Sequence, residues 1–102
     1  MEKLVAYKRM PVWNKDTMPE AVQRKHNTKV GTWGKITVLK GALKFIELTE
    51  EGEVIAENLF EAGADNPMAQ PQAWHRVEAA TDDVEWYLEF YCKPEDYFPK
   101  KY

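Results

Sequence analysis

The sequence lacks several features on which whole classes of protein depend. Cysteine occurs once, at Cys92, so no disulfide can form within the chain, and this usage is typical of a reducing cytoplasm. No apolar run approaches the roughly 20 residues of a membrane-spanning helix, and Met1-Glu2-Lys3 does not lead into an apolar signal-peptide segment. These absences predict a cytoplasmic protein with no membrane-inserted segment.

An excess of basic residues is also missing. The 14 lysines and arginines are outnumbered by 17 aspartates and glutamates, which gives a net charge of -3. Proteins that bind nucleic acid present a clustered basic surface, and the nearest thing to a cluster here is Lys100-Lys101. We therefore expect no nucleic-acid partner.

The residues that are present suit one small domain. The chain has 102 residues, of which 44% are hydrophobic and 13% aromatic, and this is enough to build one compact core. No repeat, linker or low-complexity segment divides it, so we expect a single domain over residues 1–102.

Short alternating segments separated by turns dominate the chain, and helical periodicity is almost absent. Alternation of apolar and polar residues predicts a β-strand, and it marks segments 35–39, 42–48, 74–79 and 84–91. The short apolar run 4–7 predicts a first edge strand, and 54–60 predicts a further strand. Lys40-Gly41 predicts a turn that joins 35–39 and 42–48 into a hairpin. Residues 20–25 suit a helical turn or a strand equally. The predicted fold class is all-β, as a cupin-like jelly-roll barrel or sandwich with little helix.

The segment Pro71-Gln72-Ala73-Trp74-His75-Arg76-Val77-Glu78 is the strongest candidate for a functional site. Pro71 prevents a helix from running through it, and strand alternation then places His75, Val77 and Ala79 on one face. A histidine directed into an apolar interior is a candidate ligand or proton-transfer group. The alternative is a core histidine that is hydrogen-bonded to a backbone carbonyl.

A divalent metal is one ligand that the histidines suggest. His26 and His75 are the only two histidines, and a metal needs three or four protein ligands. Glu47 is the best third candidate, because alternation places it on the same face as Phe45, whereas Glu78 falls on the face opposite His75. A site of His26, His75 and Glu47 therefore competes with purely structural roles for both histidines.

Aromatic and basic residues near these histidines suggest a pocket for a small anion or oxyanion. Trp33 adjoins Gly34, and Trp74 adjoins His75, so both lie where the mouth of a barrel is expected, although most tryptophans serve the core. Arg76 or Lys29 would attract the anion. The candidate ligand-binding residues are His26, Trp33, Trp74, His75 and Arg76.

The last predicted strand also suggests a homodimer. Its alternation leaves Tyr87 and Tyr91 off the apolar face, and exposed aromatic residues of this kind are typical anchors of protein interfaces.

Three segments carry a family resemblance: Met10-Pro11-Val12-Trp13-Asn14-Lys15-Asp16-Thr17, Lys25-His26-Asn27-Thr28-Lys29-Val30-Gly31-Thr32-Trp33-Gly34-Lys35 and the Pro71–Glu78 segment. They resemble the TehB/YeaR-like family, and the likeness extends over nearly the whole chain. It implies a cupin-like barrel in a protein tied to tellurite and oxyanion resistance. In two-domain members a C-terminal methyltransferase uses S-adenosylmethionine. No strand–Gly-x-Gly–helix signature of that domain occurs in these 102 residues, so S-adenosylmethionine is not expected to bind this chain.

The chain also departs from the metal-binding cupin pattern, which has three histidines and a glutamate. With only His26 and His75, a three-histidine site is excluded within one chain. The sequence therefore favours a non-catalytic accessory module that binds a small ligand or a metal. The alternative is a small metal-dependent cupin enzyme that acts at His26 and His75.

Overall fold

The structure is a computed structural model, which describes residues 3–97; Met1, Glu2, Lys100 and Lys101 lie outside this range. The strands are β1 (Val5–Arg9), β2 (Trp13–Asn14), β3 (Trp33–Lys40), β4 (Ala42–Leu48), β5 (Val54–Glu61), β6 (Trp74–Ala79) and β7 (Glu85–Cys92). The helices are α1 (Glu20–Gln23) and α2 (Pro94–Tyr97). Segment 20–25, for which the sequence left a helical turn and a strand equally open, thus begins as a helical turn. Neither helix of the described residues has the length and apolar character that a membrane span requires.

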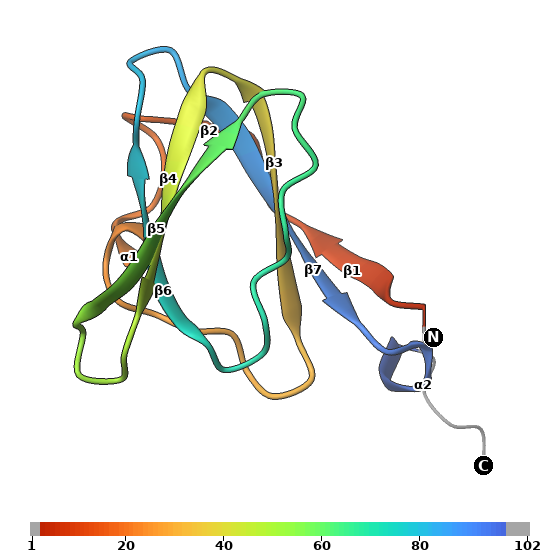
Figure 1. Cartoon of the computed structure of the whole chain (residues 1–102). Helices are drawn as coiled ribbons and strands as arrows, with labels where there is room; N and C mark the ends of the chain where they lie inside the picture. The colour runs from red at the N-terminus through yellow and green to blue at the C-terminus, as the bar shows by residue number, and fades with distance from the viewer. Residues whose placement is uncertain (1–2, 98–102) are drawn as a thin grey trace.

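Two antiparallel sheets face each other (Figure 1). In the first sheet β7 is central, with β3 on one side and β1 and β2 one after the other on the other side. The second sheet has the order β5-β4-β6. The predicted fold class is confirmed: the chain is mostly β, with little helix, and forms a sandwich that is consistent with a cupin-like fold.

The core lies between the sheets and is supplied by alternate residues of the strands. Trp86 on β7 is completely buried, and its ring meets that of Trp13 edge-on at a centroid distance of 5.2 Å. Phe45 on β4 stacks on Phe60 of β5 at 5.0 Å. Because strand side chains alternate between faces, each strand needs only every second residue to be apolar, as the sequence pattern indicated.

The predicted hairpin at Lys40-Gly41 is wrong. β3 pairs with β7, whereas β4 pairs with β5 and β6, so Gly41 is a corner at which the chain passes from one sheet to the other. Its φ of 68° lies in the left-handed region, which glycine adopts without the cost that other residues incur. Strands 35–39 and 42–48 each carry an apolar face, and these faces pack across the core. Alternation alone did not distinguish this packing from hydrogen-bonded pairing.

One end of the molecule extends beyond the sandwich. β1, the last part of β7 and α2 project away from the second sheet (Figure 1), and the molecule measures 50 × 30 × 26 Å along its principal axes. The second sheet therefore covers only the other part of β7, and the cavity described below lies on that covered part.

Candidate functional site

The structure brings His26 and His75 together. Their backbones form an antiparallel bridge, in which the His26 N–H donates to the His75 carbonyl at 3.0 Å and the His75 N–H donates to the His26 carbonyl at 2.9 Å. The two ring centroids are 4.4 Å apart, and the ring planes meet at 80°. The segment after α1 thus runs beside the start of β6 and carries His26 to it.

Local backbone geometry holds this arrangement in place. Gln72 adopts a φ of 64°, which is uncommon outside glycine, and its N–H donates to the Thr28 carbonyl at 3.0 Å. The buried Thr28 hydroxyl donates to the Thr32 carbonyl at 2.8 Å. The bond from Gln72 attaches the turn before β6 to the segment that contains His26, and the Thr28 hydroxyl bond fixes that segment locally.

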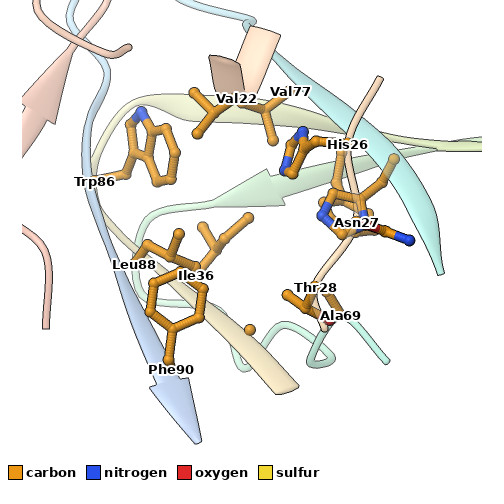
Figure 2. Close-up of a pocket in the computed structure, with 13 residues that line it drawn as sticks. Val22, His26, Asn27, Thr28, Ile36, Ala69, Val77, Trp86, Leu88 and Phe90 are labelled. Carbon is orange, nitrogen blue, oxygen red and sulfur yellow. The ribbon is translucent and has the colours of Figure 1, made fainter. Parts of the chain in front are cut away.

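A cavity of about 120 Å³ lies beside the two histidines, between the sheets. Figure 2 shows Trp86, Leu88 and Phe90 of β7 on one side of it, and His26, Asn27 and Thr28 on the other. The remaining lining residues are Val22, Gly34, Ile36, Phe45, Ala69, His75 and Val77. We call this cavity the histidine pocket. Its lining is mostly hydrocarbon, with the two imidazoles as the main polar groups.

His75 is the most unusual group in the histidine pocket. It is 5% exposed, and its Nδ1 atom is buried without a hydrogen-bond partner. Burial lowers the pKa of His75 from 6.5 to about 4, and repulsion from His26 adds to this, while the nearby Ala73 carbonyl opposes it. His75 is therefore neutral at pH 7. Its Nδ1 has only the nearby Ala73 carbonyl beside it, without a hydrogen bond of normal geometry, and a buried polar atom left in this way normally costs about 1–3 kcal/mol.

His26 is half-buried, and one hydrogen bond determines its tautomer. Its Nδ1 lies 2.8 Å from the Arg24 carbonyl. Because a carbonyl can only accept, Nδ1 carries the proton, and in the neutral ring Nε2 then keeps a lone pair. The pair of histidines thus offers one nitrogen lone pair from His26, and from His75 a ring whose Nδ1 has only the nearby Ala73 carbonyl beside it.

Glu47, the predicted third metal ligand, lies directly opposite His75 in the β4–β6 pairing. Its carboxylate accepts a hydrogen bond from Asn58 at 2.9 Å and is exposed. Among residues 3–97, no three His, Cys, Asp or Glu side chains form a group that could hold a metal ion.

The other predicted ligand-binding residues are not brought into the histidine pocket. Arg76 lies on the opposite face of β6 and pairs with Glu78 at 2.6 Å. The indole N–H of Trp33 donates to the Gln70 side chain at 3.3 Å. Trp74 borders a smaller hollow of about 70 Å³ beside Glu47 and His75, and the Lys25 ammonium lies 4.6 Å above its ring. Lys29, the alternative anion-attracting group, borders a separate hollow that also contains Cys92.

Cys92 is buried, and its thiol is poorly suited to nucleophilic chemistry. Burial raises its pKa, and the nearby Asp96 carboxylate raises it further. The thiolate is the reactive form of cysteine, so Cys92 remains largely protonated at neutral pH.

Sequence reasoning missed most of the pocket wall. Phe45, Leu88 and Phe90 were recognisable as inward-facing residues from strand alternation, and they do line the pocket. Val22 and Ala69 were not recognisable, because they belong to a short helix and a loop, where no period marks the inward face. Ala69 is placed by reciprocal backbone hydrogen bonds with Gly34, of 2.7 and 3.0 Å.

Comparison with known proteins identifies the family of this chain. Residues 8–88 match the family model of the TehB-like domain. The chain is 65% identical to the "Probable S-adenosyl-L-methionine-dependent methyltransferase TehB" of Haemophilus influenzae, over 98% of this chain and 35% of that protein. It therefore spans about a third of the length of the TehB proteins that it matches. It is also 32% identical to "Uncharacterized protein YeaR" of Escherichia coli K12, over 83% of this chain and 75% of YeaR.

Solved structures give the same result. The crystal structure of TehB from Haemophilus influenzae superposes with a TM-score of 0.91 at 66% identity, and the match covers 97% of this chain and 35% of that one. A protein from Escherichia coli K12 superposes with a TM-score of 0.82 at 31% identity, over 90% and 93% of the two chains. The second match shows that the same fold accounts for nearly all of a short chain.

Proposed function

Because this chain belongs to the TehB-like family, we propose that it is a small-ligand-binding module that contributes to tellurite and oxyanion resistance in the cytoplasm without catalysing a reaction. The observation that supports this proposal is the histidine pocket. It is a preformed cavity of about 120 Å³, and its wall contains a 5% exposed histidine whose Nδ1 has no hydrogen bond of normal geometry to the described residues. Mainly apolar cavities with a few placed polar groups are the usual form of small-molecule sites.

A catalytic role has less support. The described residues bring no nucleophile, general base and third orienting group together around the pocket, and Thr28, its only hydroxyl group, is already committed to a backbone carbonyl. The module would act by holding a ligand, whether for a partner enzyme or to keep it from the solvent.

We expect changes in the histidine pocket to lower tellurite resistance in the native host. Replacing Ala69, which is 7% exposed and lines the pocket, by leucine fills space that a ligand would occupy. The tellurite concentration that inhibits growth should fall at least threefold, while an immunoblot shows unchanged abundance of the protein. The matched control is Trp33→Phe, outside the pocket, which should leave resistance unaltered. Full resistance in the Ala69→Leu strain would contradict the proposal.

The alternative function is a metal-dependent enzyme at His26 and His75. With two imidazoles and an exposed Glu47 that is already bonded to Asn58, stable metal retention is not expected. We predict less than about one tenth of a divalent metal ion per chain after purification without chelators, measured by elemental analysis. Stoichiometric metal that is lost in His26→Gln would instead support the enzyme.

We also propose a homodimer. Tyr87 and Tyr91, the residues that suggested one, lie half-buried on the outer face of β7, with the Arg9 guanidinium 4.5 Å above the Tyr87 ring. β5 offers a second surface. It pairs with β4 alone among the described strands, and it exposes Val54, Ile55 and Leu59 by 52, 65 and 55%.

The sequence of β5 favours a second copy as the partner of this edge. Sheet edges are normally protected by lysine, proline or a covering segment. β1 and β3 carry lysines, and β6 is covered by the His26 bridge, whereas β5 has neither lysine nor proline. Antiparallel pairing with a second β5 can place Ile55 opposite Leu59 on both sides of a twofold axis.

The dimer prediction is tested by light scattering at micromolar concentration. We expect twice the chain mass of 11.9 kDa, and a single-chain mass for Ile55→Lys. Leu39→Lys is the matched control, since Leu39 is 51% exposed on β3, and it should stay dimeric. A single-chain mass for the unaltered protein would overturn the prediction.

A further inference from the structure

The histidine pocket restricts the size of its ligand. An engineered cavity of about 150 Å³ accommodates benzene, so about 120 Å³ corresponds to a molecule of around six non-hydrogen atoms. Nine of the 13 lining residues are apolar or glycine. Most of the ligand's surface must therefore be hydrocarbon, because a polar surface would be desolvated there without compensation.

The pocket also restricts the charge of its ligand. Within residues 3–97, no lysine, arginine, aspartate or glutamate lines it, and Arg76, the nearest predicted cation on β6, is turned away and paired with Glu78. His75 is neutral at pH 7. An anion would thus be buried without a counter-charge, which is strongly unfavourable.

The two histidines define the polar part of the ligand. The hydrogen bond to the Arg24 carbonyl leaves His26 Nε2 with a lone pair, which requires a donor. Among the described residues, Nδ1 of His75 has no hydrogen bond of normal geometry, although the Ala73 carbonyl lies near the ring, and the two ring centroids are only 4.4 Å apart. A single hydroxyl group can both donate and accept, so one such group can serve both rings at this spacing.

We infer, on the basis of the proposed function, that the histidine pocket binds a small uncharged molecule, mainly hydrocarbon, whose single hydroxyl-type group is held by His26 and His75. The oxyanion itself is not the pocket's ligand. The specificity follows from the lone pair of His26 Nε2 and the incompletely hydrogen-bonded ring of His75, since a site built to hydrogen-bond a hydroxyl discriminates against an analogue that lacks one.

The test uses three probes at pH 7.5: cyclopentanol, cyclopentane and tellurite. Binding is followed by NMR through the amide signals of Val77, Leu88 and Gly34, which line the pocket. Cyclopentanol should bind at least tenfold more tightly than cyclopentane. In His75→Phe, which keeps an aromatic ring but removes the nitrogens, this preference should disappear while the signals still report a folded chain. Ala69→Leu should weaken the binding of both neutral probes, whereas Trp33→Phe should leave the binding of both unchanged.

Two results would overturn the inference. If tellurite displaces cyclopentanol and depends on His75, the pocket takes anions; the proposed ligand-binding function then stands and only the ligand class is wrong. If cyclopentane binds as tightly as cyclopentanol in the unaltered chain, the hydroxyl has no role. Failure of all three probes to shift the pocket signals would count against the inference and the proposed function together.

Discussion

Replacing Gly41 by alanine is expected to lower the free energy of unfolding by roughly 3–4 kcal/mol, from the combined cost of a left-handed backbone and of overpacking. A Cβ at this position would lie 2.2 Å from the Thr81 hydroxyl oxygen, 2.5 Å from an Asp83 carboxylate oxygen and 3.1 Å from the Val84 Cα. Thr81 cannot move away freely, because its hydroxyl accepts the Ala42 N–H at 3.0 Å. The corner between the sheets must therefore distort.

Gly63 provides a matched control for this change. Its φ of 79° is close to the 68° of Gly41, but beyond its two chain neighbours no atom of the described residues lies within 4 Å of an added Cβ. Gly63→Ala should thus show only the backbone cost, about 1 kcal/mol. Urea denaturation followed by tryptophan fluorescence measures both variants. Equal losses for the two would mean that the crowding at the corner has no energetic effect.

Acidification from pH 7.5 to 4.5 is expected to remove about 2–3 kcal/mol of stability through His75 alone. Burial in the apolar pocket lowers the pKa of His75 from 6.5 to about 4 in the folded chain, whereas in the unfolded chain the pKa stays near 6.5. Between these values the unfolded state binds a proton that the folded state does not. This contribution is complete above pH 6.5, declines as the pH falls, and is lost below pH 4.

Comparison with His75→Phe isolates this contribution, because carboxylates titrate over part of the same range in both proteins. Phenylalanine keeps the aromatic contact that His75 makes with Phe45, at a centroid distance of 4.9 Å, and it does not titrate. The difference in unfolding free energy between the two proteins should change by about 2–3 kcal/mol across the range. A difference that does not vary with pH would show that His75 titrates normally. The same measurement bears on function, since a neutral His75 is what the proposed uncharged ligand requires.

Strands were predictable from this sequence, because the alternation that defines them is local. Residues 74–79 and 42–48 agree with β6 and β4 to the residue, and the inward direction of His75 followed from its spacing to Val77. The resemblance to the TehB/YeaR-like family was also recognisable in the sequence, and the similarity to the TehB-like domain and to YeaR confirms it. The pairing partners were not predictable. Gly41 looked like the turn of a hairpin, but a tight turn and a corner between sheets place glycine in the same left-handed conformation, and only the position of β7 distinguishes them.

The candidate site was likewise predictable from the sequence only in part. Two histidines next to turn residues were visible in the chain, and the structure places them 4.4 Å apart. The environment of each side chain was not visible, because it depends on residues that are distant in sequence: Asn58 occupies the Glu47 carboxylate, Glu78 pairs with Arg76, and Ala69 closes the pocket from a loop. Strand periodicity specifies the face on which a residue lies. The partner, the exposure and the protonation state of a residue depend on what packs against that face, and three-dimensional contacts between remote segments determine this.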